Sequence, residues 1–545
     1  MIAILDQIHY GLYINLTRYL IRNIHLKKKT LLSDLRHCDS MEILYIHYNL
    51  VSILIFLLPL FVVVRKWKKM NQRSLPPGPW KLPIIGSMHH LIGALPHHTT
   101  NLAKKYGPLM HLKLGEVDAV IVSSPRLAKE FLKVHDLSFA ARFKIAASDV
   151  VFYHQKDIVF AEHGDYWKCM RKICISELLS VKMVKSFSLI RQDEVHNLVA
   201  SIRSTPNNVV NMTEKALKLT SSVICRSALG EVFDDRDNLL MLMREVLVLL
   251  AGFDMVDLFP SWKLLHEIRG KRKRLMNMHH KLDVILENII NDHKENKAYG
   301  KKGNSEFGGE DLVDVLLRVM ENNELPFPMT NDNIKAFILD MFFGGTETSA
   351  TTIQWALAEL MKNPNIMAKA QAEVRWFYKE KTDVDDNDIE KLKYLKCVVK
   401  ERLRFHPPGP LLPPRECLKE TTIDVYTIPL KTKVIVNGWA MGRDPENWDD
   451  PESFVPERFE NNSVDFKGSH YQFIPFGAGS RICPGIQYSS ADVMYPLAQL
   501  LYHFDWKLPH GMKPEDLDMT ETFGVTARRK NDLHLIAIPR DLSQP

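Results

Sequence analysis

The sequence predicts one large folded domain behind a single membrane-spanning helix near the amino terminus. Two observations carry this prediction: residues 43–64 form an uncharged apolar run, and no interior stretch of the 545 residues has the composition of a linker. A chain of this length exceeds the usual size of one domain. Its apolar fraction of 46% and charged fraction of 25% are nevertheless ordinary for a globular protein with a sizeable core.

The apolar run at 43–64 has 22 residues, enough for a helix to cross the roughly 30 Å hydrocarbon core of a bilayer. Arg-Lys-Trp-Lys-Lys follows at 65–69, so we expect the rest of the chain in the cytosol. No small-residue cleavage site follows, which disfavours a signal peptide. Residues 75–83 contain four prolines, which favour a stiff, extended spacer. We therefore interpret 65–83 as a basic stop and a proline-rich hinge.

The first 40 residues do not fit this topology. They place basic side chains on the expected luminal side, at Arg18, Arg22, Lys27–Lys29 and Arg36. Met41 begins Met-Glu-Ile-Leu-Tyr, which would be an ordinary short luminal start. We expect residues 1–40 to be an upstream extension outside the functional protein.

Charge and cysteine content exclude several classes of protein. The net charge of +6, from 71 basic and 65 acidic residues, is too small for a chain of this length to favour nucleic acid. The seven cysteines are irregularly spaced and include no Cys-x-x-Cys pair. A disulfide framework and a zinc site are both disfavoured, and a reducing compartment is indicated.

One cysteine, Cys483, lies in a glycine-rich segment, Pro475–Gly485. Within ten residues the segment combines Phe476, Gly479, Arg481, Cys483 and Gly485. Glycines permit positive φ and close approach of backbone N–H groups to a sulfur. We expect such N–H groups to lower the pKa of the thiol. Thiolate ligation of haem iron favours cleavage of the O–O bond. A buried structural cysteine is the alternative interpretation.

A long helix is predicted at 330–363. Thr330 or Asn331 can cap its start, and Asn363-Pro364 ends it. Gly344 and Gly345 interrupt its middle, each costing about 1 kcal/mol relative to alanine. Polar Thr346-Glu347-Thr348-Ser349 follows them. Glycines here would let a flat ring approach the helix, and hydroxyls beside a carboxylate could relay protons. A kink with locally satisfied hydroxyls remains the alternative.

Together these motifs resemble the cytochrome P450 superfamily, over residues from about 75 to the end. The resemblance implies a mainly α fold with a small β region, as one haem-thiolate monooxygenase domain at 84–545. It implies haem b as the cofactor and Cys483 as the iron ligand. Glu347 and Thr348 then form the pair that delivers protons. The implied haem contacts in these two motifs are Arg481, Phe476, Gly477, Gly344 and Gly345.

Further motifs extend the resemblance. Trp167 and Arg171, in a Trp-x-x-x-Arg string, and Arg415 would reach the haem propionates. Glu401 and Arg404 stand one helical turn apart, and Arg458 follows in Pro-Glu-Arg-Phe. The resemblance implies that these three lock the fold around the cysteine loop. Ser480 stands where plant relatives usually have a basic residue, which concerns docking of the electron donor.

The resemblance also concerns substrate and partners. Several stretches, such as 331–352, resemble the plant microsomal branch that hydroxylates terpenoids, although near relatives oxidise alkaloids. It implies O2, a hydrophobic small molecule, NADPH-cytochrome reductase and a bilayer as partners, with the chain single-pass in the endoplasmic reticulum membrane. Expected pocket walls are mostly apolar: 145–153, 341–345, 408–412 and 523–525. The Leu- and Met-rich strip at 239–265 is either a core helix or a membrane-dipping loop.

Two other functions must be weighed. A thiolate-haem dehydratase or isomerase would need neither O2 nor the Thr348–Glu347 pair, so the presence of the pair disfavours it. A non-enzymatic haem carrier or membrane scaffold would show the haem spectrum without turnover. Requirement for NADPH and O2 distinguishes the monooxygenase from both.

Overall fold

The computed structural model describes residues 74–91, 93–204, 209–250, 253–262, 271–300, 309–379 and 384–541. The chain divides into two compact units, Met1–Ser74 and Leu75–Pro545. The predicted extension 1–40, the predicted span 43–64 and most of the basic stop lie outside the described residues. Within the described ranges, no helix combines the length and the apolar character needed to cross a bilayer.

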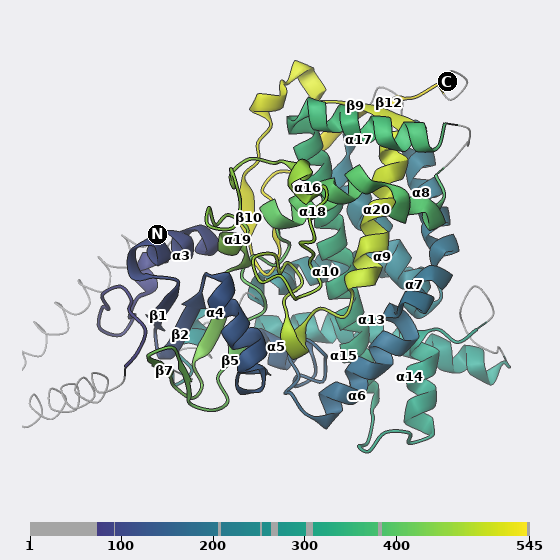
Figure 1. Ribbon diagram of the computed structural model, residues 1–545. Coiled ribbons are helices and arrows are strands. Elements are labelled where there is room, and N and C mark those ends of the chain that lie inside the picture. Colours follow the sequence, from purple (N-terminus) through teal and green to yellow (C-terminus); the bar gives the residue numbers. More distant parts are fainter. Residues whose placement is uncertain are drawn as a thin grey trace, which may run out of the picture. The chain divides into compact units, whose positions relative to one another are not determined.

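The described part of the second unit is mainly helical, as the resemblance implied (Figure 1). Its longer helices are α3 (Leu95–Tyr106), α6 (Asp165–Cys174), α8 (Ser188–Arg203), α9 (Met212–Leu229), α10 (Arg236–Leu249), α13 (Lys271–Ala298), α14 (Leu312–Glu321), α15 (Asn331–Phe342), α16 (Thr348–Lys362), α17 (Pro364–Phe377), α18 (Lys393–Phe405) and α20 (Ile486–His503). Shorter ones are α4 (Pro125–Lys129), α5 (Ala146–Val151), α7 (Val181–Ser186), α11 (Met255–Leu258) and α19 (Gly438–Met441).

Four small sheets account for the β content of the described residues. The strands are β1 (Leu109–Leu114), β2 (Val117–Val122), β3 (Ala141–Arg142), β4 (Val209–Asn211), β5 (Arg415–Glu416), β6 (Thr421–Ile423), β7 (Tyr426–Ile428), β8 (Lys433–Val436), β9 (Phe504–Lys507), β10 (Glu521–Phe523), β11 (Ala527–Arg529) and β12 (His534–Pro539). The largest sheet has the order β1-β2-β8-β5-β3 and lies beside the helical body (Figure 1). Its last two strands place Arg142 opposite Arg415.

The predicted long helix is present as α15, a π-helical turn at Phe343–Glu347, and α16. Thr330 caps it in a capping box with Asn333, and Pro364 begins the next helix. Nearly every residue of α16 is buried, because the helix packs against α9, α18 and α20 (Figure 1). A helix that is buried all round forms the centre of a domain.

The Leu- and Met-rich strip becomes α10 and α11, with residues 251–252 and 263–270 outside the described part. Helix α10 buries Leu239, Leu242 and Val246 and exposes Met241 and Val248. This buried face agrees with the core-helix interpretation of α10.

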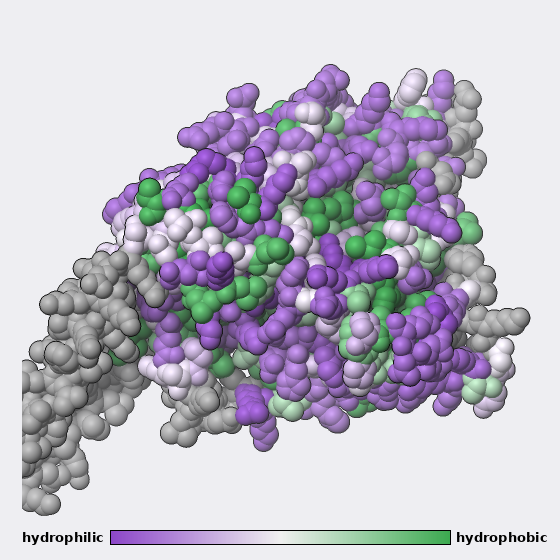
Figure 2. Space-filling model, turned by 60° about the horizontal axis from the view of Figure 1, so that its bottom comes forward, coloured by the Kyte–Doolittle hydropathy of each residue, from purple (hydrophilic) through white to green (hydrophobic). Residues whose placement is uncertain are grey.

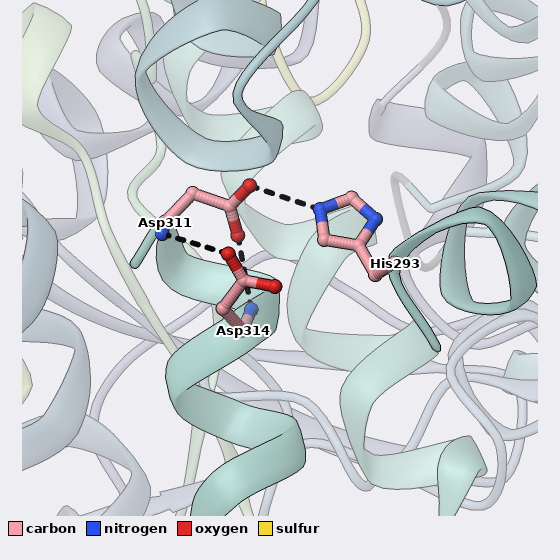
Figure 3. Close-up of side chains that lie close together, drawn as sticks. All are labelled: His293, Asp311 and Asp314. Carbon is pink, nitrogen blue, oxygen red and sulfur yellow. Dashed lines mark hydrogen bonds and ion pairs between the residues drawn. The ribbon is translucent and has the colours of Figure 1, made fainter. Parts of the chain in front are cut away.

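A buried ion pair joins the end of α13 to the start of α14 (Figure 3). His293 Nε2 lies 2.9 Å from Asp311 Oδ2, and Nδ1 lies 2.7 Å from the carbonyl oxygen of Ile289. Burial tends to lower the pKa of His293, but the hydrogen bond and charge of Asp311 raise it. Asp311 and Asp314 also cap α14 through each other's N–H groups. Both ring nitrogens of His293 have oxygen partners, and the two aspartates are occupied as the cap of α14, so hydrogen bonds within the protein account for this cluster.

Candidate active site

The cysteine loop, residues 475–485, leads directly into α20. Gly477 and Gly479 have φ of 72° and 70°, as the predicted tight turn requires. A Cβ on Gly479 would lie 1.9 Å from the carbonyl oxygen of Leu132, so only glycine fits there. Cys483 N–H donates to the Phe476 carbonyl oxygen at 2.9 Å, and Gly485 N–H approaches Cys483 Sγ at 3.4 Å. The loop therefore closes on itself and presents the sulfur.

The electrostatics of Cys483 differ from the prediction. Burial raises the pKa of its thiol, although the N–H of Gly485 and the guanidinium of Arg171 oppose the shift. The N–H of Gly485 lowers the pKa as predicted, but desolvation of the anion by burial outweighs this one long hydrogen bond. A coordinated metal cation would favour the thiolate at such a position.

A cluster of arginines lies beside this loop. Arg481 donates to the carbonyl oxygens of Ala140 and Ala161, at 2.9 and 2.6 Å. Arg415 donates to Asp136 Oδ1 at 2.7 Å and to the Ala478 carbonyl oxygen at 2.8 Å. Both guanidinium groups therefore have partners from several chain segments, which hold them in place.

The Trp-x-x-x-Arg string lies on α6, as expected. Trp167 Nε1 donates to the carbonyl oxygen of Ile158 at 3.0 Å, and the Arg171 guanidinium lies 5.3 Å from the centre of the Trp167 ring. Arg171 also donates to the carbonyl oxygen of Ile482, next to the cysteine. The structure thus brings Trp167, Arg171, Arg415 and Arg481 together around the cysteine loop.

Arg142 belongs to the same cluster and was missed by sequence reasoning. It lies opposite Arg415 in the β3–β5 pair, and donates to the carbonyl oxygens of Val159 and Pro413 at 2.9 and 2.6 Å. Burial, then the charges of Arg481 and Arg415, lower its pKa well below the usual value. Burial and the neighbouring Arg415 likewise lower the pKa of Arg481 to about 10. Such mutual repulsion marks a site suited to carboxylates.

The middle of the central helix widens into the π-helical turn. Gly344 is exposed although its neighbours Phe342 and Phe343 are buried, and a Cβ there would meet no atom within 4 Å. Thr348 Oγ1 donates to the Gly344 carbonyl oxygen at 2.6 Å. A Cβ on Gly345 would instead lie 3.1 Å from Ile224 of α9. Gly344 and Thr348 therefore border open space, whereas Gly345 serves helix packing.

Glu347 faces a polar pocket of about 280 Å³ that is partly open to solvent. The pocket is lined by Thr213, Leu217, Arg244, Glu347, Ala350, Thr351, Gln354, Thr522, Arg528, Arg529, Lys530 and Asp532. The Glu347 carboxylate is buried, and its Oε1 lies 3.8 Å from Arg528 NH1 of strand β11. Solvent can therefore reach a buried carboxylate next to Thr348.

Comparison with known proteins shows which family has this arrangement of residues. The family model described as Cytochrome P450 matches residues 76–535, most of the chain. The chain belongs to the cytochrome P450 family. Solved structures of zebra fish cytochrome P450 agree with its fold: one with abiraterone has a TM-score of 0.69 and 25% identity. It covers 82% of this chain and 99% of the matched chain.

Plant cytochromes P450 are much more similar. Premnaspirodiene oxygenase of Hyoscyamus muticus is 58% identical over 90% of this chain and 98% of its own length. The 5-epiaristolochene 1,3-dihydroxylase of Nicotiana tabacum is 57% identical over the same shares. Desmethyl-deoxy-podophyllotoxin synthase of Sinopodophyllum hexandrum is 52% identical over 90% of this chain and 97% of its own length. The chain is a haem-thiolate monooxygenase.

The residues of this P450 fit haem b. Cys483 offers a sulfur in a glycine-rich loop, and Gly344 offers bare backbone beside open space. The cluster of Arg142, Arg415 and Arg481 would hold two propionates, because its buried cations repel one another. When bound through a thiolate, haem supplies the activation of O2 and the transfer of one oxygen atom.

Glu401, Arg404 and Arg458, which were expected to lock the fold around the cysteine loop, are joined by hydrogen bonds in the structure. Arg404 makes two hydrogen bonds of 2.7 Å to the Glu401 carboxylate, and both side chains are fully buried. Arg458 Nε donates to Glu401 Oε1 at 3.0 Å. The Arg404 guanidinium also donates to carbonyl oxygens of Pro451 and Ser453. Helix α18 is thereby tied to the segment that precedes the cysteine loop.

Two of the predicted pocket walls, 145–153 and 341–345, are neighbours in the P450 structure, and a third borders the cysteine loop. The Phe152 and Phe343 rings lie 5.4 Å apart, and Leu412 Cδ1 lies 4.0 Å from the Cβ position of Gly477. Ser480 is half-buried: its N–H donates to Asp136 Oδ2 at 2.9 Å, and its Oγ is buried without a hydrogen-bond partner in the described part of the chain.

Proposed function

We propose that this cytochrome P450 hydroxylates a terpenoid hydrocarbon. The observation that carries the proposal is the identity of 58% and 57%, over nearly full length, to two plant enzymes. Their names state oxygenation of premnaspirodiene and dihydroxylation of 5-epiaristolochene. The compound names premnaspirodiene and 5-epiaristolochene have the endings of unsaturated hydrocarbons. Such substrates need an apolar pocket.

The neighbouring pocket walls support a hydrophobic substrate. Phe152 and Phe343 present aromatic surface to each other, and Leu412 borders the cysteine loop. A hydrocarbon offers no polar handle, so its orientation depends on the shape of these side chains. A second candidate class, oxidation of other specialised metabolites, is favoured by the 52% identity to desmethyl-deoxy-podophyllotoxin synthase.

We also propose that the chain is a single-pass protein of the endoplasmic reticulum membrane and takes electrons from an NADPH-cytochrome reductase. The uncharged run at 43–64 and the basic residues 65–69 support this topology. Trp80 in the hinge and Ile84 just after it are 61% and 69% exposed. Hydrophobic residues also form small groups on one largely hydrophilic face (Figure 2). Exposed apolar side chains next to an anchor suit a lipid surface.

Turnover in microsomes tests the substrate class. The full chain, combined with a plant reductase, should convert members of a panel of terpenoid hydrocarbons to alcohols in a reaction that requires NADPH and O2. Alkaloids and a precursor of desmethyl-deoxy-podophyllotoxin serve as comparison substrates. Preference for either comparison class, with the terpenoids unreacted, would overturn the proposed substrate class.

The reaction consumes a proton as well as electrons: RH, O2, NADPH and H⁺ yield ROH, H2O and NADP⁺. Thr348 holds a hydroxyl that donates to the Gly344 carbonyl at the edge of open space, and it can accept a proton from its other side. Glu347 lies next in sequence and borders the polar pocket. We infer that Glu347 takes protons from pocket water and that Thr348 passes them on.

Substitution of Thr348 should uncouple electron use from product formation. Thr348→Ala removes the relaying hydroxyl but leaves the cysteine loop and the arginine cluster intact. NADPH consumption should stay comparable, while product per NADPH falls about tenfold or more, within the range for loss of one proton-transfer group, and hydrogen peroxide rises. Product, peroxide and NADPH are measured together.

Thr346→Ala is the matched control for this experiment. The hydroxyl of Thr346 is buried and has no hydrogen-bond partner among the described residues. Its loss should leave coupling close to that of the unaltered protein. Full coupling in Thr348→Ala would mean that water or substrate alone carries the protons.

A further inference from the structure

A short segment between α5 and α6, Asp157–Ala161, holds much of the haem-facing cluster through its backbone; we name it the carbonyl loop. The Ile158 carbonyl oxygen accepts hydrogen bonds from Trp167 Nε1 at 3.0 Å and from Arg481 NH1 at 3.2 Å. The Ala161 carbonyl oxygen accepts from Arg481 NH2 at 2.6 Å. Arg142 Nε donates to the Val159 carbonyl oxygen at 2.9 Å. Three residues expected at the propionates therefore depend on where this loop lies.

Two aspartates hold the carbonyl loop by its N–H groups. Asp340, on the buried helix α15, accepts from the Ile158 N–H. Asp157, within the loop, accepts from the Phe160 N–H at 2.8 Å. Both side chains are buried, Asp157 with no exposed surface and Asp340 with 4%. A buried carboxylate that accepts backbone N–H bonds fixes the local backbone strongly.

The two carboxyl groups also meet each other. Their side chains are within hydrogen-bonding reach, yet the Oδ1 atoms of both are buried without a donor in the described part of the chain. Two carboxylates cannot donate to one another, and side by side they repel. One proton held by the pair would supply the missing donor, because a protonated carboxyl donates and the other accepts.

We propose that Asp157 and Asp340 share one proton, and that Asp340 is a positioning residue which fixes the carbonyl loop and, through it, the Arg481, Arg142 and Trp167 side chains at the haem propionates. Burial, and then the charge of Asp157, raise the pKa of Asp340. Burial raises the pKa of Asp157 as well, against the N–H of Phe160 and the charges of Arg481 and Arg142. The pair thus retains a proton that separate carboxyls would release.

Ionisable side chains from the cysteine loop, β3 and α6 face the aspartate pair. Arg481 and Arg142 face it from the cysteine loop and β3, and favour the ionised form of Asp157. Tyr166 and Cys174 face it from α6; burial raises the pKa of both, and the charge of Asp340 adds to the shift. None of these four groups gains a negative charge near neutral pH. Loss of the proton shared by the two aspartates therefore dominates the local response to pH.

The sign of the pH effect follows from the raised pKa. The folded pair holds a proton that the unfolded chain releases near about pH 4. Its contribution to stability is therefore full at low pH and is lost as pH rises through the pKa of the folded pair. Above that pKa two buried carboxylates repel each other beneath the carbonyl loop, and haem should be held less firmly.

The test measures haem loss from the purified full-length holoprotein to an excess of apomyoglobin, at about pH 6 and about pH 8.5, on either side of neutrality. Asp340→Asn keeps an oxygen for the Ile158 N–H and supplies a permanent N–H donor to Asp157. It should match the unaltered protein at the lower pH and lose haem several-fold more slowly than that protein at the higher pH. Asp340→Ala leaves a buried N–H unpaired and should lose haem about tenfold faster at both.

Asp332→Asn is the matched control, because Asp332 lies on the same helix but pairs with Lys156 at the surface. Haem loss from Asp340→Ala no faster than from Asp332→Asn would overturn the positioning role. Infrared difference spectra decide the proton even if Asp340→Ala fails to fold. The carboxylic acid C=O band of the unaltered protein at neutral pH should disappear in Asp340→Asn. A band unchanged by Asp340→Asn would show that this pair does not share a proton.

Discussion

Cys483→Ser should abolish the red-shifted Soret band that the reduced, CO-bound protein shows as a thiolate complex. Serine keeps the shape of the loop, including the N–H donation to the Phe476 carbonyl oxygen, but its hydroxyl does not ionise to replace the thiolate. Oxygen-atom transfer depends on the electron donation that a thiolate provides. We therefore expect turnover to fall below detection, with the change measured by the CO difference spectrum and by product formation.

Cys174→Ser provides the comparison. Cys174 is a free cysteine on α6 and is fully buried, but it lies outside the glycine-rich loop. Its serine variant should retain the thiolate band at nearly full intensity. Persistence of that band in Cys483→Ser, or its disappearance in a folded Cys174→Ser protein, would contradict the ligand assignment.

Glu401→Ala should destabilise the fold more than any surface substitution. It leaves the Arg404 guanidinium, which is fully buried, without the carboxylate that accepts two of its hydrogen bonds. Breaking such a buried pair costs about 3–5 kcal/mol, a large share of the stability of most domains. Arg458 and the Val455 N–H lose the same acceptor. The yield of haem-bound protein and the urea midpoint of Soret loss measure the effect.

Glu460→Gln removes a surface carboxylate that lies two residues after Arg458. Glu460 pairs with Lys369 at 3.0 Å, and both side chains are nearly half exposed. Exposed ion pairs contribute about 0–1 kcal/mol, so this variant should unfold close to the unaltered protein. Equal urea midpoints for Glu401→Ala and Glu460→Gln would refute a structural role of Glu401 in the lock.

Features written in short, local motifs could be predicted from the sequence. The turn around Cys483 depends on glycines within the same ten residues, and both adopt positive φ. The long helix at 330–363 was predicted from its periodicity, its cap and the proline that follows. The Glu401–Arg404 pair needs only one helical turn, and Arg458 lies 57 residues further along. Apart from Arg458, neighbours in sequence supply most of these contacts.

Features that depend on distant segments could not be predicted. Arg142 joins the cluster because β3 pairs with β5, and no motif surrounds it in the sequence. Asp157 and Asp340 meet only after α15 packs beneath the carbonyl loop. The net shift in the pKa of Cys483 could not be predicted from its loop alone, because desolvation reflects the whole surroundings of the sulfur. Arg528 contacts Glu347 although it lies 181 residues further along the chain.

The contact of Arg528 with Glu347 matters for engineering the product profile of this enzyme. Arg528 lies on β11, opposite Thr522 of β10, and the tip between these strands contains Gly524 and Val525, which are predicted to face substrate. The hairpin is therefore predicted to contact the substrate at its tip, and through Arg528 it lies 3.8 Å from the Glu347 carboxylate. Product selectivity and the coupling of NADPH consumption to product formation are therefore linked. Variant libraries that diversify the hairpin tip should be screened for uncoupled NADPH consumption as well as for the product profile.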